Sequence, residues 1–573
     1  MFDAAPEKVV ANTDLCLMFR SMPSFPSLQL LEELIDIFLL EDTYAIGSHI
    51  HIPTFDSRKT RAELLLAMVA RGAAFVSYAP IWKMGFVLQD VVRYAIAAEF
   101  ERDNSTTRDL QAVQTSLMWV NTGVWSGFRR FTEIAASFLQ PPVTMLAWSN
   151  AFTRPRYREI VPSPEDSSEV LEQKWREWAE QEAWKRLVFN FFLHDAQAML
   201  VHMRSPLITP AQMKLPIPSS RDLWLASNAH AWRGVFLAQN PFDGGAAPST
   251  IEMFSDPELF SGADHHTDKS LCRLLVAHSM AHDVFEHRQE AQMLQHAGER
   301  RRRDKGMSHM SRLLDLYVLA SDIIAVCLAN RFRRYDDLTA FLTSCEADHA
   351  TPPEIPFVLE FLMMTLHVSL DDIQLFAGRE GEDEARRIFP QVRAWTRDSE
   401  SRKAVWHAGQ VFNHAKAFEK TRLRDFYAVA MYHATLVLWV WGMVTSGSSR
   451  QSGIATPVGT TMPQHPPPQI AFTTLKSQAR VVLDGPESKI SKAFVQLGHG
   501  TPGLLNAVRP ANEMLDARPS TTSEVFISLF DSRGVMTSAA GVLKGNFPHT
   551  KGSLPPLVAN LSNLLDELGK LPS

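Results

Sequence analysis

Apolar residues recur along most of this chain at steps of three and four positions, the spacing that places them on one face of an α-helix. The clearest such face comprises Leu187, Val188, Phe191, Phe192, Ala196, Met199, Leu200 and Met203. The same period predicts helices over Leu28–Leu40, Ala62–Val76, Val87–Phe100, Leu110–Leu139, Lys269–Gln295, Met310–Arg331, Leu338–Cys345, Ile355–Leu370, Ser401–Gly442 and Leu554–Leu568. Alternation typical of strands is scarce. The pattern therefore predicts an all-α fold: a large multi-helix domain with a small helical C-terminal tail packed on it.

Breaks in this pattern predict four segments. Residues 1–25 form a leader that we expect to be disordered, and residues 26–444 form the helical domain. Residues 445–470 are rich in Ser, Gly and Pro, which is typical of a flexible linker. Residues 471–573 form the tail, whose last helix has one apolar stripe: Leu557, Leu561, Leu564, Leu565 and Leu568. A single helix of this length is marginal in water, so the tail should fold back on the domain.

One stretch has the length and composition of a membrane span. Phe426 to Val444 is uncharged and mostly apolar, close to the length that crosses a bilayer. It also contains Tyr427, Tyr432 and His433. A helix that is apolar on all sides is equally typical of the core of a large protein. We therefore expect a buried helix here and no membrane contact.

The charge balance argues against a polyanion-binding chain. The net charge is −6, and the only dense basic cluster is Arg300, Arg301, Arg302, Arg303 and Lys305. That cluster is either a nuclear-import signal or a solvated helix end, and no direct contact with nucleic acid is evident. The four cysteines, Cys16, Cys272, Cys327 and Cys345, lie far apart. They favour a reduced compartment over a disulfide framework.

Residue patterns that carry catalytic or cofactor chemistry are incomplete. Gly498 to Gly503 satisfies Gly-x-Gly-x-x-Gly, but a predicted helix precedes it, so Gly498 is better explained as a helix C-cap. His278, His282 and His287 share one helical stretch without a further ligand, so we expect core or solvated histidines and no metal site. Nucleophile elbows, phosphate loops and paired catalytic carboxylates are absent from the sequence. We therefore predict no catalytic, cofactor-binding or metal-binding residues, and no enzymatic activity.

A single acid, Asp195, lies on the apolar face that begins at Leu187. With Arg186 it could suggest an acid in a cleft, but no paired acid, base or nucleophile accompanies it. A buried carboxylate needs hydrogen-bond donors. The next segment is an extended crossing imposed by Pro206, Pro210, Pro216 and Pro218. We expect Asp195 to accept hydrogen bonds from this crossing or from the N-terminus of a neighbouring helix.

Five phrases in this order resemble the regulatory, or middle homology, domain of fungal-specific transcription factors. The resemblance is closest to the branch that carries a pair of two-Cys two-His zinc fingers. The phrases are His51–Asp56, Gly123–Gly127, Arg186 to Trp232, Trp406–Gln410 and Tyr432–Leu436. The residues that match the family signature are His51, Pro53, Thr54, Phe55, Trp125, Arg186, Asp195, Trp224, Trp232, Trp406 and His407. The resemblance covers most of the chain from about Leu30 onward.

The resemblance implies a nuclear regulator of transcription that contacts coregulators or binds a small effector. Metabolic or biosynthetic-cluster genes are its expected targets. One departure matters: no pair of closely spaced cysteines occurs, so no residue here matches a zinc finger. DNA binding would then need a partner or a separate module, and zinc is expected only there. Two alternatives remain open. One is an all-α small-molecule-binding protein or enzyme, and the other is a truncated module that modulates full-length relatives.

Overall fold

A computed structural model describes residues 26–239, 247–256, 266–303, 310–451, 479–508, 523–547 and 554–571. Its first half consists of α2 (Leu28–Tyr44), α3 (Ala62–Phe75), α4 (Ala79–Arg102), α5 (Leu110–Val124), α6 (Arg129–Ser137), α7 (Gln140–Trp148), α8 (Ser168–His202), α9 (Arg221–Trp224), α10 (Ala229–Gln239) and α11 (Thr250–Ser255). Short 3-10 turns lie at Ile52–Thr54, Asn104–Arg108, Arg154–Arg156 and Pro210–Gln212. The chain is mostly helical, as predicted.

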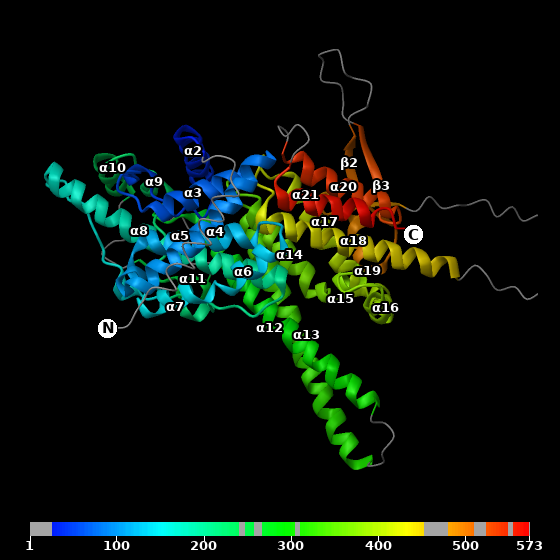
Figure 1. The fold of residues 1–573 in the computed structure, drawn as a ribbon. Helices are drawn as coiled ribbons and strands as arrows, with labels where there is room; N and C mark the ends of the chain where they lie inside the picture. Colours follow the sequence, from blue (N-terminus) through cyan, green and yellow to red (C-terminus); the bar gives the residue numbers. More distant parts are fainter. Residues whose placement is uncertain are drawn as a thin grey trace, which may run out of the picture.

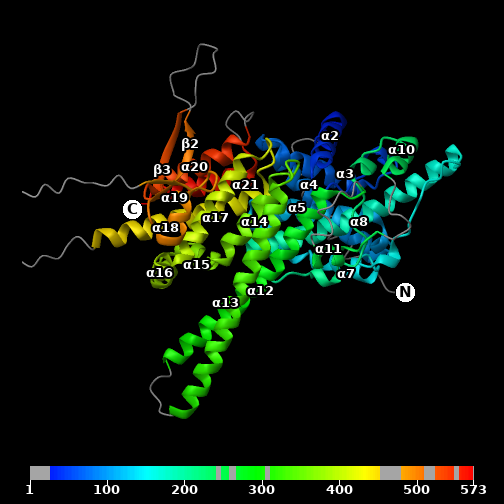
Figure 2. The ribbon, with the colours of Figure 1, turned by 180° about the vertical axis from the view of Figure 1, so that it is seen from behind.

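The second half consists of α12 (Lys269–Arg303), α13 (Met310–Glu346), α14 (Glu354–Leu366), α15 (Leu370–Phe376), α16 (Glu382–Thr396), α17 (Ser399–Lys416) and α18 (Asp425–Gln451). The two halves lie side by side in Figure 1, and α12 and α14 are the helices of the second half that lie nearest the first. The hairpin of α12 and α13 extends away from this body, as the reverse view in Figure 2 also shows. A single helical body therefore carries one long projecting hairpin.

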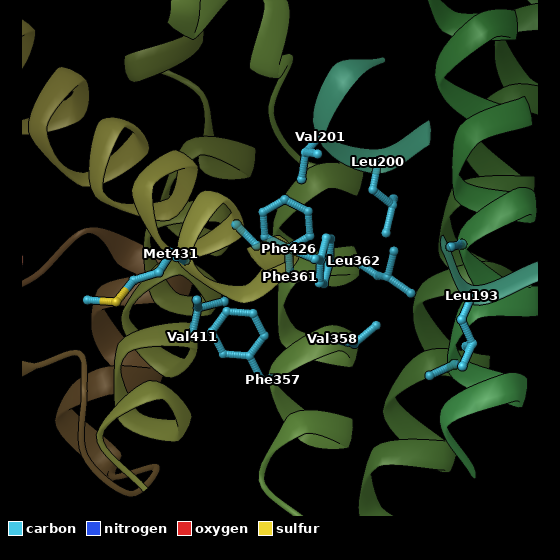
Figure 3. Close-up of a cluster of buried hydrophobic side chains, with 14 of the residues drawn as sticks. Leu193, Leu200, Val201, Phe357, Val358, Phe361, Leu362, Val411, Phe426 and Met431 are labelled. Atoms are coloured by element: carbon cyan, nitrogen blue, oxygen red, sulfur yellow. The ribbon is translucent and has the colours of Figure 1, made fainter. Parts of the chain in front are cut away.

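The core is centred on α14, in which every residue from Ile355 to Leu366 is buried. Phe357 and Phe361 of α14 pack with Phe426 and Met431 of α18, Val411 of α17 and Leu193 of α8 (Figure 3). Most of α18 is buried, although its length and composition would suit a membrane span. This confirms the predicted core helix at Phe426–Val444. Helices from both halves thus share one continuous apolar core.

Several predicted helix boundaries are wrong, for local reasons. The single helix expected over Leu110–Leu139 is divided into α5 and α6, because the chain turns at Trp125–Phe128, where Gly127 has a φ of 78°. Pro141 and Pro142, which should end that helix, lie instead in the first turn of α7. Proline is tolerated there because the backbone N–H groups of a first turn have no partner within the helix. The single helix expected over Ser401–Gly442 is also divided, because α17 ends at Lys416 and α18 begins at Asp425. Conversely, the two helices expected within 310–345 are one helix, α13.

The C-terminal tail combines helices with a small sheet that the sequence pattern did not predict. It contains β1 (Arg480–Val482), α19 (Lys489–Leu497), β2 (Thr501–Val508), β3 (Ser523–Ser528), α20 (Ser532–Gly545) and α21 (Pro556–Leu568). Strand β1 pairs in parallel with β2, and β2 pairs antiparallel with β3. Short apolar runs of this length show no periodicity that separates strand from helix. Gly498 caps α19 in the left-handed conformation, with a φ of 75°, as predicted.

The tail packs on the helical domain, as predicted, through α17 and α18. Gln410 of α17 donates hydrogen bonds from Nε2 to the carbonyl oxygens of Leu483 (2.7 Å) and Gly485 (2.8 Å). Gly409 of α17 and Gly442 of α18 allow this approach, because a Cβ on either would overlap the tail backbone at Leu483 or Leu529. The expected leader 1–25 and most of the expected linker 445–470 lie outside the described residues, and α18 continues past residue 444.

The glycine contacts predict how the tail can be released. We expect Gly442→Val to lower the free energy of unfolding by about 2 kcal/mol, because an overpacked interface forces the backbones apart. Hydrogen exchange should rise in β1, β2 and β3 while α14 stays protected. Gly541→Ala in α20 is the matched control, since a Cβ there meets no atom within 4 Å. Equal exchange in both variants would contradict the docking role of Gly442.

Candidate functional site

The signature arginine of helix α8 is the centre of a buried polar network. Arg186 has no exposed side-chain surface and donates from Nε to Glu182 Oε1 (3.1 Å). Its Nη2 donates to the Ser219 carbonyl oxygen (3.0 Å) and to Asp268 Oδ2 (3.0 Å). The indole ring of Trp224 lies 4.7 Å from the guanidinium carbon. We call Glu182, Arg186, Ser219, Trp224 and Asp268 the Arg186 corner.

The Arg186 corner joins three segments that are far apart in the sequence. Ser219, in the crossing after α8, donates to Glu182 from its amide (3.0 Å) and its hydroxyl (2.9 Å). Asp268 accepts the Leu271 amide (3.1 Å) at the start of α12. Burial alone would raise the pKa of Glu182, but Lys185 and Arg186 outweigh it and hold this pKa below its usual range. Every carboxylate of the corner has a cationic partner, so the network stabilises the fold and offers no free acid or base.

Aromatic rings and the histidine of the first signature phrase cover the corner. His51 packs against Trp224, with ring centroids 4.7 Å apart, and against Trp175 and Trp178. Burial and the nearby Arg186 lower the pKa of His51 to about 4. Trp224 Nε1 donates to Ser48 Oγ (3.1 Å), and Trp178 packs on Trp232 at 5.5 Å. The residues that resemble the family signature in α8, α9, α10 and the first loop therefore meet in one place.

Asp195 accepts the hydrogen bonds that the sequence predicted for it from the proline-rich crossing. Its Oδ2 accepts the amides of Leu207 (2.6 Å) and Ile208 (2.9 Å), which lie in the proline-rich crossing. Its Oδ1 accepts Arg204 Nη2 (3.0 Å). Burial raises the pKa of this carboxyl, and the two amides and Arg204 oppose the rise. Arg186, which the sequence suggested as a partner for Asp195, is held by Glu182 and Asp268 instead.

The contacts of Asp195 predict a loss of stability on substitution. Asp195→Ala should lower the free energy of unfolding by about 3 kcal/mol, because the amides of Leu207 and Ile208 would lose their acceptor. Urea denaturation followed by circular dichroism measures this change. The control is Asp566→Ala, which removes a half-exposed ion pair with Lys544. An unchanged midpoint combined with loss of transcriptional activity would show that Asp195 acts in signalling and not in folding.

A cavity of about 200 Å³ lies where the first and second halves of the chain meet. Its walls come from α2, α3, α5, α8, the first residue of α14 and the segment that begins α18. A cavity of about 150 Å³ can hold benzene, so this volume suits a small molecule. We call it the Asn121–His194 cavity, after two of its lining residues.

Buried polar atoms of His194 and Asn121, which line the Asn121–His194 cavity, lack a hydrogen-bond partner within the described part of the chain. His194 is 3% exposed, and neither ring nitrogen has a hydrogen-bond partner. The buried Oδ1 atom of Asn121 is also without a donor. Burial, followed by Arg204 and His202, lowers the pKa of His194 to about 3, so its ring is neutral at neutral pH. A neutral imidazole has one donor and one acceptor, and an unpaired buried polar group costs about 1–3 kcal/mol.

The arginines around this cavity are already paired with acids. Arg71 contacts Asp425 at 2.5 Å, and Glu41 contacts both Arg424 (2.9 Å) and Arg422 (3.7 Å). These cations therefore leave no strong demand for an anionic ligand. The cavity favours a neutral molecule that both donates and accepts hydrogen bonds.

The other predicted signature residues have structural surroundings. Trp125 lines the Asn121–His194 cavity and lies edge-on to His194. Pro53 and Thr54 form the 3-10 turn after His51, and Phe55 packs on the core. Trp406 is half-buried against the core, and His407 Nδ1 lies 2.6 Å from Glu360 Oε2. The signature residues therefore lie at several separate places in the fold and do not form a single pocket.

The predictions for the histidines of α12 and for the basic cluster have different outcomes. His278 Nδ1 lies 2.8 Å from the Leu274 carbonyl oxygen, and both nitrogens of His282 face carbonyl oxygens. These two are core histidines, as expected. Arg300, Arg301, Arg302 and Arg303 end helix α12, and Lys305 lies outside the described residues.

Several site residues were missed by sequence reasoning. Glu182 and Ser219 hold Arg186, but neither belongs to a recognisable motif. Asp268 is the first residue before α12, and an acid at a helix start is a signal for a cap and not for a distant arginine. Asn121 reads as an ordinary helical residue, and its role depends on tertiary packing alone.

Comparisons with known proteins match this chain to fungal regulators. Residues 36–255 match a family model described as "Fungal specific transcription factor domain". The chain is 22% identical to transcription factor PfmaH of Pestalotiopsis fici over 69% of its own length and 40% of that protein's. It is 23% identical to transcription factor 1 of Elsinoe fawcettii, over 68% of this chain and 40% of that protein.

A shorter match adds a zinc-finger relative. Zinc finger protein klf1 of Schizosaccharomyces pombe is 24% identical over 34% of this chain and 24% of that protein. The chain thus spans about 40% of the length of the first two relatives. No solved structure matches. The matched family is one of transcription factors and not of enzymes.

Proposed function

Residues 36–255 are a fungal-specific transcription factor domain, and from this premise we propose that the chain is a nuclear regulator of transcription. The observation that carries the proposal is the family match, which coincides with the helices that build the Arg186 corner and half of the core. Metabolic or biosynthetic-cluster genes are the proposed targets, on the family resemblance alone. Transcriptional coregulators are the proposed partners, because the helical body offers surfaces for binding and no catalytic group at the Arg186 corner.

DNA recognition is proposed to come from another module or from a DNA-binding partner. The four cysteines of the chain are too far apart to form a zinc finger, and the net charge is −6. A reporter driven by a heterologous DNA-binding module fused to the chain tests this. We expect altered transcription only when the chain is tethered. Activity of the untethered chain on the same promoter, or no effect of tethering, would contradict the proposal. Silencing of a full-length relative by the free chain would favour a modulating module instead.

Nuclear entry is proposed to use the basic cluster at the end of α12. Arg300, Arg301, Arg302, Arg303 and Lys305 provide five cations within six positions. Residues 300–305 fused to a fluorescent protein should direct it to the nucleus. A matched fusion with the five cations changed to Gln should stay in the cytoplasm. Cytoplasmic retention of the unchanged fusion would contradict this assignment.

Effector binding is proposed at the Asn121–His194 cavity. Its unpaired His194 ring and Asn121 oxygen would gain partners from a neutral ligand that carries hydroxyl or amide groups. The cavity contacts both the matched domain and the helices beyond it, so a ligand there would alter how the two halves pack. Differential scanning fluorimetry with a library of small neutral metabolites tests this. A ligand should stabilise the wild-type chain, and His194→Phe should abolish the shift.

A further inference from the structure

The hairpin of α12 and α13 brings together three metal-ligating side chains, away from the Arg186 corner and the Asn121–His194 cavity. His287 and Glu290 lie one turn apart on α12, and Cys327 lies opposite them on α13. The sequence had grouped His287 with His278 and His282, but those two turn into the core. Helices α12 and α13 lie side by side in the hairpin (Figure 1), and this packing brings the side chains of His287 and Cys327 together.

The geometry of the three donors is that of a metal site. One ligand atom from each residue lies within 4.8 Å of the others, and His287 Nδ1 is 3.8 Å from Cys327 Sγ. Tetrahedral zinc, with bonds of about 2.3 Å to sulfur and about 2.0 Å to nitrogen, separates these two atoms by about 3.5 Å. A movement of a few tenths of an ångström therefore brings His287 and Cys327 to coordinating distance, and the exposed Glu290 side chain can rotate to supply the third ligand.

From this geometry we infer that His287, Glu290 and Cys327 form a zinc-binding site between α12 and α13. Thiolate, imidazole and carboxylate together suit zinc, whereas calcium and magnesium select oxygen ligands alone. The three protein ligands leave a fourth position, which water fills on the side of the exposed Glu290. On binding, the Cys327 thiol releases its proton to solvent and the metal takes its place.

The charges around the site are compatible with a dication. Arg331, one turn beyond Cys327, is ion-paired with Glu400 at 3.2 Å, so part of its charge is neutralised. Glu290 and the Cys327 thiolate supply two negative charges against the two of zinc. Arg334 is a second cation near His287 and Cys327, and Asp283 lies close enough to Arg334 to offset part of its charge. The site would tie α12 to α13.

Cobalt titration of the full, reduced chain tests the inference. Co²⁺ replaces zinc in such sites and reports a thiolate ligand by a charge-transfer band. We expect one Co²⁺ per chain with this band, and its displacement by zinc. Cys327→Ser should abolish the band, and His287→Gln should weaken zinc binding by about 100-fold or more, since loss of an outer partner alone costs about 10- to 100-fold. Two control variants should keep both the band and the zinc affinity: His349→Gln, at an exposed histidine, and Cys345→Ser, at a buried thiol.

Outcomes that overturn the inference are equally clear. No thiolate band in the wild-type chain, or a band that survives Cys327→Ser, would show that the three residues bind no metal. Glu290→Gln changes an exposed position and should leave the fold intact, so it separates ligand loss from misfolding. Unchanged zinc affinity in that variant would overturn the three-ligand assignment. Circular dichroism of each variant confirms that the comparison concerns folded protein.

Discussion

Arg186→Met should lower the free energy of unfolding by about 3–5 kcal/mol, the largest effect we expect from one substitution. The change removes the cation from Asp268 and one of two cations from Glu182, which keeps Lys185, and both carboxylates are almost fully buried. A charge that has lost its partner in the interior must be desolvated without compensation. It also removes the donor to the Ser219 carbonyl oxygen and the cation over Trp224. The urea midpoint of the full chain measures the loss.

A surface ion pair provides the control for Arg186. Arg129 on α6 contacts Glu133 at 2.7 Å, but both side chains are exposed. Arg129→Ala should leave the urea midpoint unchanged, because solvent screens such a pair. If Arg186→Met moved the midpoint no further than Arg129→Ala, the Arg186 corner would contribute little to the fold.

Mild acid should destabilise the domain by several kcal/mol. Burial lowers the pKa of several histidines to about 3 or 4, among them His51, His194, His202, His278 and His433. In the unfolded chain their pKa returns to about 6.5, so the unfolded state binds more protons between these values. The free energy of unfolding therefore carries no penalty from these histidines above about pH 6.5, and it falls as the pH drops from 6.5 towards 4. Each of these histidines should lower the free energy of unfolding by about 1 kcal/mol at pH 5.5.

Urea midpoints at pH 7.5 and 5.5 measure this acid sensitivity. His433→Phe should reduce the difference between the two pH values by about 1 kcal/mol, because a group that cannot be protonated no longer favours the unfolded state. The exposed His349, changed to Gln, should leave the difference as it is. A domain equally stable at both pH values would contradict the neutral, buried state of these rings.

The sequence was sufficient for the architecture where one helical face is long. The apolar period around Leu187 predicted a buried face on α8, and the uncharged stretch of Phe426–Val444 predicted the buried part of α18, because burial dictates such patterns. The break between α17 and α18 was missed. The three strands of the tail were missed, since Arg480–Val482 and its partners are too short to show a period. The turn at Gly127 was missed because one left-handed residue divides α5 from α6 without any change in hydrophobicity.

The polar site was only half predictable. A buried Asp195 needs donors, and the proline-rich crossing follows it directly, so its partners could be named in advance. The partners of Arg186 could not, because Ser219 and Asp268 are 33 and 82 positions away. The Asn121–His194 cavity depends on how α2, α5, α8 and α18 pack against one another, which no local pattern encodes.

The tethered reporter measures the central claim most directly: that the helical domain receives a signal in the Asn121–His194 cavity and passes it to transcription. His194→Phe should change reporter output several-fold while the urea midpoint stays equal or rises, because an unpaired polar ring is removed. His433→Phe, at another buried histidine with an unpaired nitrogen but outside this cavity, should leave output unchanged. Equal output from wild type and both variants would contradict the account.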